Sequence, residues 1–248
     1  MFYKRPFKQL LLVSLLALSC SQAVAGVVIT GTRLVYPAGQ KEITVKLNNN
    51  GSQPALTQSW IDTGNAESTP TNSKAPFVLS PPVARIDPGK GQSLRVMFTG
   101  AALAANKESV FWLNVLEIPP KPQDAEAQNM LQMAFRSRIK LFYRPDGLPG
   151  TPTEAIEQVQ WQVVPASKGQ GMALQAFNPS AFHVSVVELE LVAGAQRNRG
   201  TDGMVGPGET RQFALEKPNA LPGGNAQVAF NAINDYGALV PTRKALKP

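Results

Sequence analysis

Hydrophobic and polar residues alternate in short runs along the first half of the chain. The runs are rich in Val, Ile, Phe and Trp, and turn-forming clusters such as Asn49-Asn50-Gly51 and Asp87-Pro88-Gly89 separate them. Alternation with a period of two is typical of half-buried β-strands, whereas Pro, Gly, Asn and Asp clusters are typical of turns. The pattern predicts strands at 27–36, 42–48, 55–62, 77–80, 84–86, 93–98, 109–118 and 130–143.

The same pattern resumes in the second half, after a segment that has the composition of a linker. Residues 144–152 contain three Pro and two Gly without apolar periodicity. No stretch after residue 25 shows a helical period over three turns. Each half is close to the ~100 residues of one immunoglobulin-like sandwich, so we predict an all-β fold with two such domains, at 26–147 and 148–248. The strands expected in the second half are 158–164, 172–178, 183–192, 210–215 and 226–233.

Residues 1–25 have the pattern of a cleavable secretion signal. Three basic residues precede an apolar run at 10–18, and Ala23-Val24-Ala25 forms an A-x-A cleavage site. The apolar run is shorter than the ~20 residues that a membrane-spanning helix needs. We therefore expect cleavage before Gly26. A membrane anchor and a lipoprotein site at Cys20 are the alternatives.

The composition of the 248-residue chain argues against most kinds of active site. His183 is the only histidine, and the only cysteine, Cys20, lies in the segment expected to be removed. Zinc sites, Cys–His nucleophile pairs and disulfide frameworks need several such side chains, so no metal, cofactor or disulfide is expected. We expect His183 to be a packed or exposed strand residue. The net charge of +7 includes no block of five basic residues, which gives nucleic-acid binding no support.

The last strand predicted in the first half, 130–143, is long compared with the ~5–6 residues most common for strands. Leu131, Met133 and Phe135 recur at every second position, so in a strand they share one face. Lys140 has the opposite parity and leaves by the other face unless a bulge intervenes. The apolar face either belongs to the core of its own domain or forms an exposed edge that fills a groove on a partner, a role that suits the adaptable side chain of Met.

Three short motifs follow one another along the chain. The first-strand motif is Gly31-Thr32-Arg33-Leu34-Val35-Tyr36-Pro37, and Arg138-Ile139-Lys140-Leu141-Phe142-Tyr143-Arg144-Pro145 ends the first half. Asn234-Asp235-Tyr236-Gly237 lies near the C-terminus, and Asn178-Pro179 supports it. In this order and behind a secretion signal, the motifs resemble the periplasmic chaperones of the chaperone/usher pilus pathway, the PapD-like family.

The resemblance implies two sandwiches in an L or boomerang arrangement that bind newly secreted pilus subunits in the periplasm. Each subunit is an incomplete sandwich, and a chaperone of this family lends one of its own strands to fill the groove. Leu131, Met133 and Phe135 correspond to the donated side chains. The chaperone then delivers the subunit to an outer-membrane usher, and it has no enzymatic activity and no membrane span.

The resemblance also implies roles for four charged residues. Arg33 and Lys140 correspond to the pair that anchors the C-terminal carboxylate of the subunit in the cleft between the domains. Arg144 and Asp235 correspond to residues that can form an interdomain ion pair.

Two other kinds of protein are compatible with the composition. A structural or adhesive surface protein built from two sandwiches would close its own sheet edges, and it would polymerise or bind a surface ligand. A secreted hydrolase has less support, because the sequence contains no G-x-S-x-G elbow, metal cluster or partnered His base.

Overall fold

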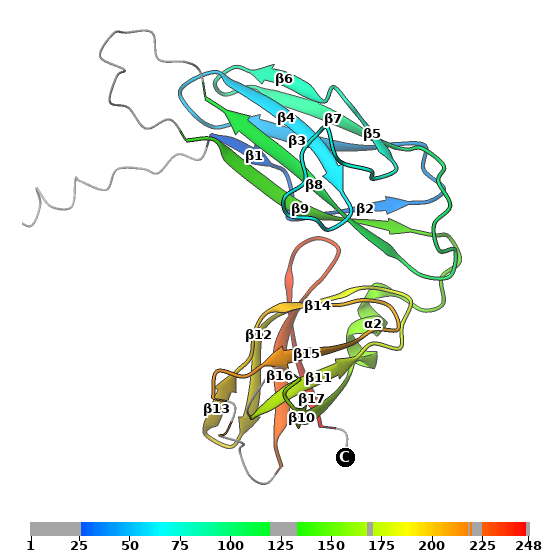
Figure 1. Ribbon diagram of the computed structural model, residues 1–248, viewed down its shortest axis with the longest axis vertical. Helices are drawn as coiled ribbons and strands as arrows, with labels where there is room; N and C mark the ends of the chain where they lie inside the picture. Colours follow the sequence, from blue (N-terminus) through cyan, green and yellow to red (C-terminus); the bar gives the residue numbers. More distant parts are fainter. Residues whose placement is uncertain (1–25, 120–132, 168–170, 218, 220–224, 247–248) are drawn as a thin grey trace, which may run out of the picture.

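The computed structural model describes residues 26–119, 133–167, 171–217, 219 and 225–246. The predicted secretion signal at 1–25 and the candidate Leu131 lie outside the described residues. Two β-sandwiches follow one another along the chain and meet at an angle, with the connection between them on one side (Figure 1). The predicted all-β fold with two immunoglobulin-like domains is confirmed.

The first domain packs a four-stranded sheet, β1-β3-β7-β5, against a five-stranded sheet, β2-β9-β8-β4-β6. Alternate side chains point between the two sheets, and Tyr36, Leu94 and Leu113 are at most 1% exposed. The strands are β1 (Val27–Ile29), β2 (Arg33–Pro37), β3 (Ile43–Asn49), β4 (Ala55–Asp62), β5 (Phe77–Ser80), β6 (Val83–Ile86), β7 (Gly91–Phe98), β8 (Ser109–Ile118) and β9 (Phe135–Arg144).

The prediction of one strand over 27–36 is wrong, because this segment forms two strands in different sheets. β1 pairs with β3 and β2 pairs with β9. The chain crosses from one sheet to the other at Gly31, whose φ of +99° is a conformation that residues with a side chain rarely adopt. The crossing places Arg33, the first residue of β2, beside β9.

β9 has a strand on both sides along only part of its length. It pairs with β8 in a regular antiparallel register from Phe135 to Tyr143, but it pairs with β2, in parallel, only from Lys140 to Arg144. On the β2 side, residues 135–139 therefore have no strand partner within the described part of the chain. Such an edge is a template on which another chain can add a strand.

The second domain packs sheet β10-β11-β15 against sheet β13-β12-β16-β17, in which β14 also pairs with β12. Trp161, Leu174 and Phe213 are at most 1% exposed and lie in its core. The strands are β10 (Gln160–Pro165), β11 (Met172–Phe177), β12 (Val184–Ala193), β13 (Gln196–Arg199), β14 (Gly203–Val205), β15 (Thr210–Ala214), β16 (Gln227–Ile233) and β17 (Leu239–Ala245).

A short helix that the sequence pattern did not predict, α2 (Pro152–Gln158), begins at the last residue of the linker. The Oγ of Thr151 accepts a hydrogen bond from the Glu154 amide, and the Glu154 carboxylate accepts one from the Thr151 amide. This capping box stabilises a helix of seven residues, which is too short to show a periodic pattern. The spacing of Thr151 and Glu154 was the available sequence signal.

Three strands of the second domain were not predicted. β13 contains only Gln, Arg and Asn, and β14 has three residues, so neither shows an alternating apolar pattern. β17 carries a Pro and two basic residues, which obscure its alternation. These three strands form because they pair with β12 or β16, and not because their own side chains alternate.

Candidate functional site

Arg33 and Lys140 are register partners across the parallel strands β2 and β9. Adjacent strands lie ~4.8 Å apart, so the two side chains leave the same face of the sheet as close neighbours. Both reach the second domain: Nη1 of Arg33 donates to the Ile233 carbonyl at 2.7 Å, and Nζ of Lys140 donates to Oγ of Ser185 at 3.2 Å. The structure thus brings together the two cations that the resemblance singled out, in a cleft between the domains.

Neither cation of this pair has a carboxylate partner among the ion pairs of the described residues. Two other arginines of β9 do have one: Arg138 lies 2.6 Å from Asp62, and Arg144 lies 2.7 Å from Glu108. Nε of Arg33 is buried without a hydrogen-bond partner, and Arg33 lines a hollow of about 220 Å³. Glu108 and Asp235 line the same hollow, but among the described residues their ion pairs are with Arg144 and His183 and not with Arg33 or Lys140.

The pKa of Lys140 reflects this arrangement. Burial, followed by the nearby charges of Arg33 and Arg211, lowers the pKa of Lys140 to about 8. Burial also lowers the pKa of Arg33, although Asp235 and Glu108 oppose the change. An anion that entered the cleft would relieve the cost of holding these charges together, and a carboxylate matches the donors of both side chains.

Replacing Lys140 by Met should stabilise the free protein at neutral pH by roughly 1–3 kcal/mol, because it removes a buried charge whose pKa is lowered to about 8. Each unit of this pKa shift corresponds to ~1.4 kcal/mol, and solvent screening reduces the total. The folded protein releases the Lys140 proton near pH 8, whereas the unfolded chain keeps it to pH ~10.4. The destabilisation by Lys140 is therefore complete below pH 8 and disappears as the pH rises to about 10.

Urea unfolding of both proteins between pH 6 and 10 measures this difference, and Lys46→Met, at an exposed position on β3, is the control. A stability gain by Lys140→Met that did not shrink above pH 8 would contradict the prediction.

Met133 and Phe135 lie where β9 begins, and they are 55% and 61% exposed. The alternative that they belong to the core of their own domain is therefore wrong for these two side chains. The register of β9 with β8 contains no bulge, so Lys140 leaves by the face opposite Phe135. The exposed apolar side chains and the cationic cleft thus lie at the two ends of the open edge at 135–139.

Arg144 joins the two domains. Its Nη1 and Nη2 lie 2.7 and 3.0 Å from the two carboxylate oxygens of Asp235, which is in the turn between β16 and β17. Figure 1 shows this turn reaching towards the first domain. Burial alone would lower the pKa of Arg144, but its hydrogen bonds to Asp235 and Glu108 outweigh burial and raise the pKa. The contact that the resemblance implied between Arg144 and Asp235 is present.

Sequence reasoning did not find Glu108 as part of this interface. Its Oε1 accepts from Nε of Arg144 at 2.7 Å, and its Oε2 accepts from the His183 amide at 2.8 Å. The ring of His183 is packed, with Nδ1 3.2 Å from the same oxygen and the ring 5.5 Å from that of Phe142. A glutamate beside Lys107 in a loop looks like an ordinary surface charge, so no sequence signal marked Glu108.

The described residues contain no group of three or more His, Cys, Asp or Glu side chains arranged to hold a metal ion. Within those same residues, none of the helices has the length and apolar character needed to cross a membrane.

The fold and the cleft define a two-domain immunoglobulin-like protein with a cationic site between its domains. Residues 26–149 match the family described as pili and flagellar-assembly chaperone, PapD N-terminal domain. Residues 154–244 match the family described as pili assembly chaperone PapD, C-terminal domain. The chain belongs to this family of PapD-like pilus-assembly chaperones.

Relatives that are similar over nearly the whole chain have chaperone names. The chaperone protein FimB/FhaD of Bordetella pertussis is 41% identical over 237 residues, which cover 94% of this chain and 93% of that protein. The probable fimbrial chaperone YadV of Escherichia coli is 44% identical over 89% of each chain. The crystal structure of YadV matches with a TM-score of 0.77 over 90% of this chain and all of the other. The Pseudomonas aeruginosa CupB2 chaperone matches with a TM-score of 0.74 at 33% identity, over 89% of this chain and all of the other.

Proposed function

We propose that the mature chain is a non-enzymatic periplasmic chaperone that captures newly secreted pilus subunits and passes them to an outer-membrane usher. Membership of the PapD-like family and the fimbrial-chaperone names of the relatives support this function. The observation that carries it is the open edge of β9 at 135–139, which begins at exposed Met133 and Phe135 and ends at Arg33 and Lys140.

The open edge provides the main-chain contacts for a strand of the subunit. An added strand would form hydrogen bonds with the backbone of 135–139, on the side where β2 has not yet begun. Met133 and Phe135 would then enter an apolar groove of the subunit and be removed from water. Burying apolar area contributes roughly 25 cal/mol per Å², so two large side chains supply a substantial part of the affinity.

The position of the cations sets the direction of the bound strand. Arg33 and Lys140 lie at the β2 end of the open edge, so a strand that places its C-terminal carboxylate there runs parallel to β9. β2 is also parallel to β9, and the bound strand would lie end to end with β2 in the same sheet. Arg33 and Lys140 would hold the carboxylate, and the subunit would be bound in one register.

Co-secretion with a pilus subunit encoded beside an usher tests this function. We expect a soluble complex with one subunit per chaperone, which then binds the periplasmic part of the usher, whereas the subunit secreted alone aggregates. The structural or adhesive alternative predicts polymers of this chain and no complex. A chain that stays monomeric and captures no subunit would overturn the proposal.

A further inference from the structure

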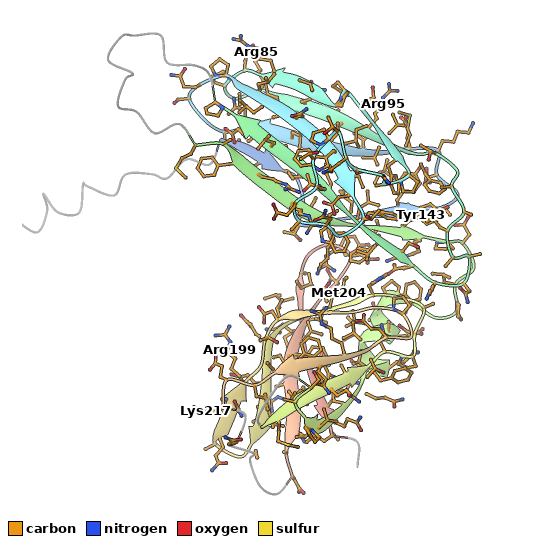
Figure 2. The ribbon with its side chains drawn as sticks, in the orientation of Figure 1. Arg85, Arg95, Tyr143, Arg199, Met204 and Lys217 are labelled. Carbon is orange, nitrogen blue, oxygen red and sulfur yellow. The ribbon has the colours of Figure 1, made fainter. Side chains whose placement is uncertain are left out.

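Arg211 of the second domain is connected to Lys140 through residues of β12 and β14. Ser185, which accepts the hydrogen bond from Lys140, is 1% exposed and lies on β12, where its register partner is Met204 of β14. The carbonyl of Met204 accepts a hydrogen bond from Nη1 of Arg211 at 2.8 Å. In Figure 2, Met204 lies on the side of the second domain that is turned to the first. A continuous set of contacts therefore connects the guanidinium of Arg211 to Lys140.

A glycine makes the space in which this guanidinium lies. A Cβ at Gly203 would come within 3.3 Å of Cζ and Nη2 of Arg211 and within 2.8 Å of the ring of Phe213. The guanidinium also lies over the ring of Phe213, with Cζ 5.5 Å from the ring centre. Arg211 is thus positioned by a carbonyl, an aromatic ring and the absence of a side chain, although it is an exposed residue.

Arg211, like Arg33 and Lys140, has no carboxylate partner among the ion pairs of the described residues. Arg211 is one of the two charges that help to lower the pKa of Lys140, so the two cations repel each other in the free protein. Lys140 thus has two cationic neighbours, and Glu108 and Asp235, which act on Arg33 from a distance, form their ion pairs with Arg144. The repulsion on Lys140 opposes folding, and a bound anion would reduce that cost.

We propose that Arg211 is a third ligand of the bound carboxylate, so that the subunit's C-terminus is held from both domains at once. This inference rests on the proposed function and adds a residue that the family resemblance did not single out. A carboxylate has about four acceptor positions, enough for Arg33 and Lys140 from the first domain and Arg211 from the second. Binding would also hold the two domains at a fixed angle, because the anion bridges them.

The test uses a short C-terminal peptide of the subunit that the chain captures, made with a free carboxylate and as the C-terminal amide. Arg211→Gln should weaken binding of the free-acid peptide about tenfold, as expected for one lost charge-assisted hydrogen bond, and should leave binding of the amide unchanged. Arg211→Lys should keep part of the affinity. Arg199→Gln is the matched control, since it removes the same charge from an exposed position on β13 (Figure 2).

A second measurement needs no ligand. In the free protein, Arg211→Gln should raise the pKa of Lys140, measured by NMR of the lysine side chain, whereas Arg199→Gln should not. Wild-type affinity of Arg211→Gln for the acid, or equal losses for acid and amide, would overturn the role of Arg211. A loss of affinity of Arg33→Gln for the acid peptide would still support the proposed function. If Arg33→Gln lost no affinity, or if the chain captured no subunit, carboxylate anchoring would be wrong, and so would the role of Arg211.

Discussion

Met133→Glu should abolish subunit capture and leave the free chaperone folded. The Met133 side chain is exposed before binding, so a carboxylate there stays hydrated in the free protein. In the complex, the same carboxylate would be buried in an apolar groove without a partner, which costs several kcal/mol. A loss of ~3–4 kcal/mol corresponds to several hundredfold in affinity. Co-purification and the melting temperature of the free chaperone, measured on the same preparations, check both halves of the expectation.

Phe135→Glu should behave in the same way, with a small additional loss of stability. Phe135 is the register partner of Glu117 across β8 and β9, and two carboxylates opposite each other repel. Val78→Glu, on exposed β5 of the other sheet, is the control that should still capture subunits. If Met133→Glu unfolded the free protein, the residue would belong to the chaperone's own core, and strand donation through it would be wrong.

Strands with strict alternation could be located from sequence, and crossings between sheets could not. The run at 42–48 agrees with β3, in which buried and exposed residues alternate, and the runs at 55–62 and 109–118 agree with β4 and β8. The run 27–36 looks like one strand, since sequence alternation does not record that the chain changes sheets at Gly31. β13 is stabilised by its pairing with β12 and not by burial of one face, so its sequence shows no alternating pattern from which the strand could be predicted.

The candidate site was accessible from sequence only in part. Arg33 and Lys140 are 107 positions apart, and the family motifs, not spacing, placed them together. Their closeness depends on the parallel pairing of β2 with β9. Glu108 is an ordinary charge in the sequence, and it contacts His183 only because the second domain packs against the first.

The pairing of charges separates the residues that hold the domains together from those that are available to a ligand. Arg144 has two carboxylate partners, Glu108 and Asp235, so its charge stabilises the interface. Among the described residues, the side chains of Arg33 and Lys140 donate hydrogen bonds only to a carbonyl and a hydroxyl, and the pKa of each is lowered. Burial of a cation without a counter-ion is unfavourable in the free protein, and it is the arrangement that an anion-binding cleft requires.

Arg33→Ala and Lys140→Ala should each weaken subunit binding by ~2–5 kcal/mol, or ~30-fold to several thousandfold, because either change removes one cationic donor from a desolvated carboxylate. Neither free protein should lose more than ~1 kcal/mol of stability, since each cation makes one hydrogen bond to an uncharged group and removal of a buried, unpaired charge opposes that loss. The double variant should lose less than the sum of the two single losses, because both changes break the same contact.

The pH dependence of binding isolates the contribution of Lys140. A bound carboxylate raises the pKa of Lys140 above its value of about 8 in the free protein, so binding takes up a proton when the pH is near or above 8. The affinity of the wild type should therefore fall as the pH rises above 8, by at most about tenfold per unit, and that of Lys140→Ala should not change with pH in this range. For Arg33→Ala the fall should begin at a higher pH, because the charge of Arg33 helps to lower the pKa of Lys140. Affinities measured by calorimetry at pH 7, 8 and 9 check this. If wild-type binding did not depend on pH, Lys140 would not be part of the carboxylate site. For the double variant of Arg33 and Lys140, strictly additive losses of affinity would argue against a shared carboxylate.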